Sequence, residues 1–191
     1  MNNYLIMVAG LPGTGKTTTV NKLANTLENY VLISQNDIRR KQFMKKMPKT
    51  QDQILRNIDI LTANYLRIGK GVILDSVHRH SSRRNQVYGV ASCCESNVIT
   101  LECVCSPETA KKRIIARPSS DGLISDPNDP RVYDKLASTW EDISVDFKHP
   151  GNSHVSYITY NTENQDFKIN YCTIGTKNFV NKIKRLLKAT P

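Results

Sequence analysis

The sequence predicts an α/β fold, a three-layer sandwich in which helices cover both faces of a five-stranded, mainly parallel sheet. Short apolar runs alternate with helical patterns along most of the chain, and this order is typical of parallel sheets, whose strands are joined by helices. The 191 residues suit one such domain with a full core and are too few for two ordinary ones. We therefore expect a single domain over residues 1–191.

Each expected strand is an apolar run bounded by polar or turn residues. The first run reads YLIMVA, and the third reads GVILD and ends in Asp75. The five expected strands cover residues 4–9, 30–34, 71–75, 98–105 and 154–160. Residues 162–173 show no clear pattern, so no element is assigned there.

Helical patterns fill the intervals between these runs. In the first interval, Val20, Leu23, Ala24 and Leu27 lie at helical spacing. A pattern over residues 131–143 and the amphipathic stretch KNFVNKIKRLLK predict two more helices towards the C-terminus. The helices expected between the strands cover residues 17–27, 51–68, 83–93 and 107–116.

The segment GLPGTGKTT has the spacing G-x-x-x-x-G-K-T. Glycines let successive backbone N–H groups turn inward around phosphate oxygens, and the helix that follows favours an anion at its N-terminus. The charge of Lys16 suits the outer phosphates, and the hydroxyl of Thr17 suits Mg²⁺. We expect a nucleotide to be bound by Gly10, Pro12, Gly13, Thr14, Gly15, Lys16, Thr17 and Thr18.

Polar residues that follow the second and third strands should reach the same site, because ligands of open parallel sheets bind beyond the carboxyl ends of the strands. Asp75 ends the third strand, where a carboxylate can bind Mg²⁺ or orient a nucleophile; a helix cap or turn is the alternative. Asp37, Arg39 and Arg40 follow the second strand. A carboxylate and a guanidinium suit the phosphorylation of a hydroxyl, the first as a base and the second as a partner for the acceptor's charge. For Asp37 the alternative is helix capping.

Arg113 and Arg117 lie four residues apart around the end of the expected helix 107–116, so they should point the same way. Such cations can stabilise charge that develops between the terminal phosphate and its acceptor. Solvated arginines are the alternative. The segment RPSSDGLISDPNDP that follows is rich in Pro, Ser, Asp and Gly, and we expect a lid around residues 117–135, or else a surface loop.

Lysine and arginine number 27 against 17 acidic residues, which gives a formal net charge of +10. This excess favours a polyanionic partner such as a nucleic acid or a nucleotide, although a solvated basic surface gives the same count. Two basic runs should border the strand ends, residues 39–49 and the segment HRHSSRR. From these runs we expect Arg39, Arg40 and Arg84 to contact the substrate.

The five cysteines form no metal-ligand pattern. Cys103 and Cys105 share one face of an expected strand, which indicates buried free thiols and favours a reducing compartment. The sequence shows neither a secretory signal nor a membrane-spanning run. We therefore expect a cytoplasmic protein without a membrane partner.

The segments GLPGTGKTT, SQNDIRR, VILDSVHRHSSRR and CSPETAKKRIIAR, in this order, resemble the P-loop kinases that include 5′-hydroxyl polynucleotide kinases, zeta-toxin-like kinases and small-molecule phosphotransferases. The resemblance covers residues 1–143. It implies a P-loop NTPase fold with ATP and Mg²⁺ as cofactors. It assigns the phosphate and metal roles to Lys16 and Thr17, the role of strand-end aspartate to Asp75, and the role of lid arginines to Arg113 and Arg117.

The chain departs from the polynucleotide kinases at one position. In that group the base stands three residues before the arginine, and the residue three before Arg39 is Asn36, which cannot accept a proton. Asp37 with Arg40 has the same spacing, Asp75 is the other available carboxylate, and loss of the activity is the third alternative. We expect Asp37 to be the base.

Three functional interpretations follow. The first is an ATP-dependent kinase that phosphorylates a hydroxyl of a nucleic acid or nucleotide. The second is a kinase of a small metabolite, sugar or antibiotic, because a fold does not settle the substrate. The third is a nucleotide-dependent ATPase or switch that transfers nothing. Basic residues spread away from the cleft favour the first over the second, and acceptor-side arginines favour both kinases over the third.

Overall fold

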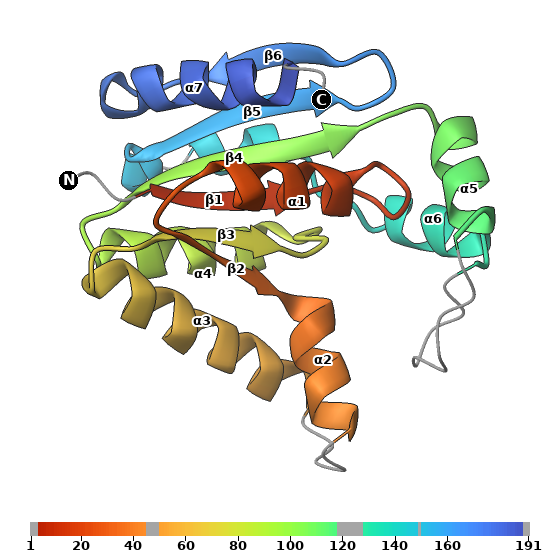
Figure 1. The fold of residues 1–191 in the computed structure, drawn as a ribbon, viewed down its shortest axis with the longest axis horizontal. Coiled ribbons are helices and arrows are strands. Elements are labelled where there is room, and N and C mark those ends of the chain that lie inside the picture. Colours follow the sequence, from red (N-terminus) through yellow and green to blue (C-terminus); the bar gives the residue numbers. More distant parts are fainter. Residues whose placement is uncertain (1–3, 45–49, 118–127, 149, 189–191) are drawn as a thin grey trace.

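The computed structural model describes residues 4–44, 50–117, 128–148 and 150–188. Its centre is a six-stranded sheet in the order β2-β3-β1-β4-β5-β6 (Figure 1). The parallel strands are β1 (Tyr4–Ala9), β2 (Tyr30–Ser34), β3 (Gly71–Asp75), β4 (Asn97–Val104) and β5 (Val155–Asn161). The expected α/β fold with a mainly parallel sheet is therefore confirmed.

The sixth strand, β6 (Asp166–Tyr171), corrects the expected count of five. It pairs antiparallel with β5 at the edge of the sheet. Of its side chains only Phe167 is buried, and its sequence DFKINY alternates polar and apolar residues instead of forming an apolar run like those of the inner strands. The turn between β5 and β6 lies at the carboxyl end of β5.

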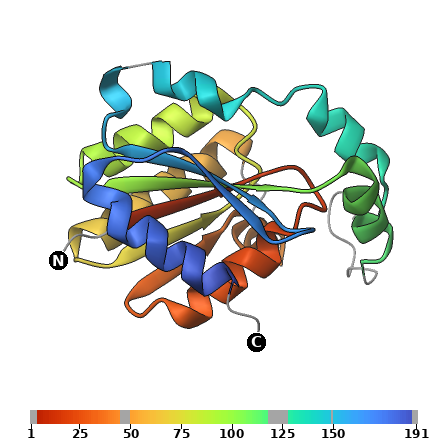
Figure 2. The ribbon, with the colours of Figure 1, turned by 90° about the horizontal axis from the view of Figure 1, so that it is seen from above.

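Helices cover both faces of the sheet (Figure 2). On one face, α1 (Lys16–Thr26) and α7 (Lys177–Lys188) pack on β-strand side chains such as Ile6 and Val8. On the other, α3 (Gln51–Arg67) and α4 (Ser81–Ser92) pack on Leu5 and Met7. The alternation of β1 side chains between the two cores follows from the two-residue period of a strand.

Three further helices lie beyond the carboxyl ends of the strands (Figure 1). They are α2 (Gln35–Met44), α5 (Pro107–Ile115) and α6 (Arg131–Ala137). The helix expected over residues 131–143 is thus shorter, and the 3-10 helices η1 (Ile143–Lys148) and η2 (Pro150–Asn152) follow it. Residues 118–127 of the expected lid lie outside the described residues.

A third 3-10 helix, η3 (Ile174–Thr176), precedes α7. Because β4 ends at Val104, Cys105 lies just past the strand and is only partly buried, whereas Cys103 is buried. None of the described helices has both the length and the apolar character that crossing a membrane requires.

Candidate active site

The glycine-rich loop joins β1 to α1. Gly10, Gly13 and Gly15 have φ angles of 144°, 79° and 83°, a region that L side chains rarely adopt. A Cβ atom on Gly13 would lie 2.2 Å from the carbonyl oxygen of Ala110 in α5, so the loop approaches α5 at a distance that only glycine allows. The loop is followed directly by the N-terminus of α1, where unpaired N–H groups favour an anion.

Lys16 is the first residue of α1, and its ammonium group lies inside the loop. Its Nζ donates a hydrogen bond of 2.8 Å to the carbonyl oxygen of Leu11. Burial lowers the pKa of Lys16 to about 8, although Cys103 and Asp75 act in the opposite direction. A desolvated ammonium group of this kind gains stability when phosphate oxygens come close to it.

Asp75 lies at the carboxyl end of β3. The register of the parallel sheet pairs it with Val8, just before the loop, and its side chain lines the same cleft as Lys16 and Thr17. Burial raises the pKa of Asp75, and the nearby charge of Lys16 opposes this rise. Asp37 raises the pKa of Asp75 further, so the charges of these two carboxylates interact.

The first turn of α2 forms another wall of the cleft through Gln35, Asn36 and Arg39. The hydroxyl of Ser76 donates a hydrogen bond to Oε1 of Gln35, and this contact joins the end of β3 to the start of α2. Oγ of Ser34 accepts a hydrogen bond of 3.4 Å from the backbone N–H of Asp37. Helix capping by Asp37, the alternative considered for this residue, is therefore replaced by a contact from Ser34.

Asp37 and Arg40 are not among the residues that line the cleft. They form an ion pair with each other at 3.9 Å, with side chains that are 57% and 55% exposed. Asn36 and Arg39 have the same spacing and do line the cleft. The structure thus brings the asparagine, and not the neighbouring aspartate, to the position beside Arg39, and the role of Asp37 as a base stays a prediction.

Arg113 and Arg117 line the cleft from the side of α5. The guanidinium group of Arg113 donates to Oγ1 of Thr162 at 2.8 Å and to its carbonyl oxygen at 3.3 Å. The hydroxyl of Thr162 donates in turn to the carbonyl oxygen of Thr14 at 2.9 Å. The turn between β5 and β6, which sequence reasoning missed, therefore connects Arg113 to the glycine-rich loop; the position of Thr162 just past the strand end was the available signal.

The cleft has a volume of about 710 Å³, which lies in the range of small-molecule sites. Val132 and Leu136 of α6 add apolar side chains to its lining. A second cavity of about 330 Å³ shares Gly15 and Arg113 with the cleft and extends to Gln165. A ligand whose phosphates occupy the loop has room for a further group in this second cavity.

The prediction that Arg84 contacts the substrate is wrong. Its side chain is fully buried, and it donates to the carboxylate of Asp146 from Nε at 2.6 Å and from a terminal nitrogen at 3.0 Å. The neighbouring Arg83 makes two hydrogen bonds to Asp59, at 2.8 and 2.7 Å. These two arginines hold α4 against η1 and α3, so most of the basic run HRHSSRR faces inward.

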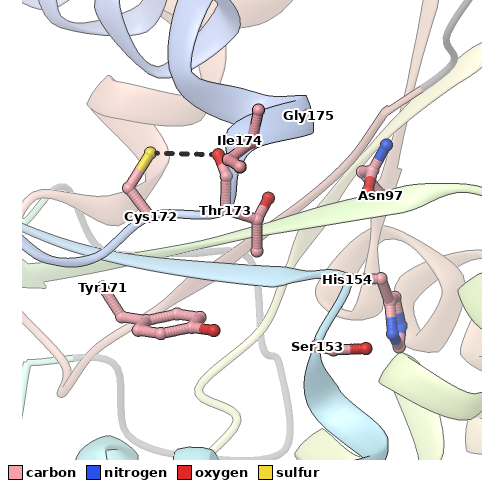
Figure 3. A pocket seen from close by; sticks show the side chains of 8 residues that line it. All are labelled: Asn97, Ser153, His154, Tyr171, Cys172, Thr173, Ile174 and Gly175. Carbon is pink, nitrogen blue, oxygen red and sulfur yellow. Dashed lines mark hydrogen bonds between the residues drawn. The ribbon is translucent and has the colours of Figure 1, made fainter.

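A separate hollow of about 510 Å³ lies at the opposite end of the sheet (Figure 3). Asn97 and His154 lie at the amino ends of β4 and β5, and residues 171–175 complete the hollow. A ring nitrogen of His154 lies 3.1 Å from the carbonyl oxygen of Tyr88, and the thiol of Cys172 donates to the carbonyl of Thr173. The described residues that line this hollow include no lysine or arginine, so it lacks the cations that the loop site offers to phosphates.

The fold and the glycine-rich loop define a nucleotide-binding P-loop protein of the kinase type. The chain belongs to the AAA domain family, whose model matches residues 5–138. Comparison with curated protein sequences found no match.

Three solved structures show the same fold. Kti12 from Chaetomium thermophilum, in complex with ADP-AlF3, is 19% identical with a TM-score of 0.64, and the match covers 97% of this chain and 100% of that one. A sugar kinase from Janibacter sp. HTCC2649 is 15% identical with a TM-score of 0.60, and the match covers 100% of this chain and 97% of that one. A chain of the Pnkp1/Rnl/Hen1 RNA repair complex is 18% identical with a TM-score of 0.58, and the match covers 72% of this chain and 45% of that one. At these identities the likeness concerns the fold.

Proposed function

We propose that the protein is an ATP-dependent kinase that transfers the terminal phosphoryl group to a hydroxyl of a nucleic acid or nucleotide. The observation that carries this proposal is the convergence of Lys16, Asp75 and Arg39 on one cleft. Phosphoryl transfer needs a cradle for the nucleotide phosphates, a carboxylate for a metal ion or a proton, and cations for the remaining charge. The neighbours described as an ADP-AlF3 complex and as an RNA repair complex support this donor and this class of acceptor.

In this proposal the phosphates of ATP lie on the backbone N–H groups of the loop and on Lys16. The adenine base of ATP occupies the second cavity, beside Thr162 and Gln165. Thr17 and Asp75 offer oxygen ligands in the same cleft, and oxygen is the ligand type that Mg²⁺ prefers, so these residues fit the ion. When bound there, the ion neutralises charge on the outer phosphates.

Among the described residues that line the cleft, Asp75 is the one carboxylate, and we propose that it orients the acceptor hydroxyl and accepts its proton. Its raised pKa suits a base, because a base works best when its pKa is near the working pH. Asp37 is the second candidate for this role. To act, its side chain would leave the ion pair with Arg40 and turn towards the cleft.

The class of acceptor is inferred from Arg39. Beyond this residue α2 carries Arg40 and Lys41, which are exposed, so a phosphate backbone that leaves the cleft along α2 meets further cations. Arg83 and Arg84 face inward and form ion pairs with aspartates, so they do not offer their charges to an acceptor backbone. The inward position of these two cations favours a small-molecule kinase as the second candidate function.

The deciding experiment offers labelled ATP and Mg²⁺ to the protein with a panel of 5′-hydroxyl RNA, 5′-hydroxyl DNA, nucleosides and sugars. We expect label to pass to an oligonucleotide or nucleoside hydroxyl, and Lys16→Ala to abolish the transfer. Transfer to sugars alone would establish the small-molecule alternative. Release of inorganic phosphate without any labelled acceptor would establish an ATPase.

A further inference from the structure

The side chain of Thr162 contacts two parts of the nucleotide site at once. Its Oγ1 lies 2.8 Å from a terminal nitrogen of Arg113 and 2.9 Å from the carbonyl oxygen of Thr14. The other terminal nitrogen of Arg113 lies 3.3 Å from the carbonyl oxygen of Thr162. A Cβ atom on Gly15 would lie 3.0 Å from Oγ1 of Thr162, so this side chain also packs directly against the backbone of the glycine-rich loop.

The direction of these hydrogen bonds follows from the groups that form them. A guanidinium group has no acceptor, so Arg113 donates and Oγ1 of Thr162 accepts. The single hydroxyl hydrogen of Thr162 is then left for a carbonyl oxygen. The carbonyl oxygen of Thr14 is closer to Oγ1, at 2.9 Å, than that of Val104, at 3.5 Å. Because the positively charged donor polarises the hydroxyl, the bond from Thr162 to Thr14 is strengthened.

The carbonyl group of Thr14 belongs to the same peptide group as the N–H of Gly15. This peptide bond is trans, and in a planar trans peptide the C=O and N–H bonds point in opposite directions. A carbonyl oxygen that is held against Thr162 therefore turns the N–H of Gly15 away from Thr162. Gly15 and Lys16 line the cleft, and Thr162 lines the second cavity instead.

The backbone around Thr162 is held on two sides. The N–H of Thr162 donates to the carbonyl oxygen of Val104 at 2.9 Å, which continues the pairing between β4 and β5. The carboxylate of the next residue, Glu163, accepts hydrogen bonds from the N–H of Ser106 at 3.0 Å and from the hydroxyl of Thr109 at 2.6 Å. The turn after β5 is thus attached both to the end of β4 and to the start of α5.

We propose that Thr162 is a positioning residue for the nucleotide: its hydroxyl fixes the N–H of Gly15 towards the phosphates and holds the guanidinium group of Arg113 beside the same loop. The N–H of Gly15 then needs no reorientation when a phosphate oxygen arrives, and such preorganisation raises affinity. The proposal rests on the binding of nucleotide phosphates by the loop, which is part of the proposed function, and does not depend on the identity of the acceptor.

The test compares Thr162→Val with Thr162→Ser in the full chain. Valine keeps the shape of threonine but has no hydroxyl, whereas serine keeps the hydroxyl and lacks the methyl group. Calorimetric titration with ADP and Mg²⁺ measures nucleotide affinity. We expect Thr162→Val to weaken this affinity roughly three- to tenfold, the equivalent of one hydrogen bond, and Thr162→Ser to keep most of the affinity of the unaltered protein.

The ¹⁵N chemical shift of the Gly15 amide reports the same contact without any nucleotide. A hydrogen bond to the carbonyl oxygen of a peptide group draws electron density away from the nitrogen of that group. Loss of the bond should therefore move the Gly15 signal upfield in Thr162→Val and leave it in place in Thr162→Ser. A residue that only stabilised the turn would not give this difference at Gly15.

Thr159→Val is the matched control, because it removes a hydroxyl from the same strand, where Oγ1 of Thr159 accepts a hydrogen bond of 2.7 Å from Asn170. Thr159 is not among the described residues that line the cleft or the second cavity. Both measurements should therefore stay as in the unaltered protein.

A crystal structure of the unaltered protein with ADP decides even if Thr162→Val fails to fold. It should show Oγ1 of Thr162 at hydrogen-bond distance from the carbonyl oxygen of Thr14, and the N–H of Gly15 directed at a phosphate oxygen.

An unchanged ADP affinity in Thr162→Val, equal losses in the valine and serine variants, or an N–H of Gly15 that faces away from the phosphates would overturn the inference. A protein that shows the expected differences in affinity and chemical shift but phosphorylates no acceptor would instead overturn the kinase proposal, and would leave the role of Thr162 standing.

Discussion

At the scale of single residues, the pKa of Lys16 links nucleotide binding to pH. Burial places it at about 8 in the free protein, so a large fraction of the side chain is neutral at pH 8. Phosphate oxygens favour the ammonium form and raise the pKa. We therefore expect nucleotide binding to take up protons near pH 8, and nucleotide affinity to fall as pH rises through this value.

Calorimetry in two buffers with different ionisation enthalpies measures this proton uptake. The control is Lys16→Arg, since a guanidinium group stays charged over the whole range and should show neither the uptake nor the loss of affinity. Equal uptake by the two proteins would assign the proton to another group.

The two candidate bases give opposite expectations at the same scale. Asp75→Asn should lower turnover by roughly two to four powers of ten, the range expected when a general base is lost. Asp37→Asn should leave turnover close to that of the unaltered protein, because the Asp37 side chain lies outside the cleft lining. Single-turnover kinetics at saturating ATP compare the two variants, and the reverse order would make Asp37 the base.

The sequence predicts some site residues better than others, for a physical reason. Lys16 and Thr17 line the cleft because the loop and the helix start that place them are contiguous in the chain. Arg39 and Arg84 both follow strands within basic runs, yet one lines the cleft and the other is buried. Their directions depend on how α2 and α4 pack, and the buried partner Asp146 is 62 residues away from Arg84 in sequence.

At the scale of elements, α4 and η1 are joined by one buried ion pair. Asp146 accepts hydrogen bonds from Arg84 and also from the hydroxyls of Ser81 and Tyr88. We expect Asp146→Ala to lower the free energy of unfolding by about 3–5 kcal/mol, because it leaves the Arg84 charge buried without its partner. Urea denaturation measures the change.

Asp37→Ala is the comparison for that measurement. It breaks an exposed ion pair with Arg40 and should cost no more than about 1 kcal/mol. Similar losses for the two variants would mean that Arg84 finds another partner or becomes solvated when Asp146 is removed.

The elements themselves were predictable in proportion to how apolar they are. β1, β3 and the face of α7 are buried at nearly every inward position, so their periodicity is clear in the sequence. In β6, by contrast, backbone pairing with β5 and the single buried side chain of Phe167 fix the strand. The segment DFKINY nevertheless alternates polar and apolar residues with the two-residue period of a strand, and this alternation was the available signal for the sixth strand.

At the scale of the whole molecule, the net charge of +10 matters for acceptor binding only where it borders the cleft. If a nucleic acid runs along α2, oligonucleotide affinity should fall log-linearly with salt concentration. Replacing Arg40 and Lys41 by alanine should reduce the slope by up to about 1.4, at ~0.7 per phosphate contact for single strands. Fluorescence anisotropy over a salt series measures the slope.

Replacing Lys182 and Arg185 by alanine provides the control, because it removes the same charges from α7, at positions that line neither cavity of the nucleotide site. Equal slopes for both double variants would mean that net charge alone, and not contacts along α2, determines the salt dependence of oligonucleotide affinity. The absence of oligonucleotide binding at low salt would favour a small acceptor.

The antiparallel β6 also bears on how the molecule behaves at high concentration. β6 ends the described sheet, so the outer side of its backbone presents N–H and C=O groups to which a strand of another molecule can pair. Asp166 and Lys168 are exposed on this strand, and charged side chains on an edge disfavour such pairing because they would have to be desolvated or placed against like charges. The two charged residues of β6 are thus expected to disfavour edge-to-edge association of the folded protein.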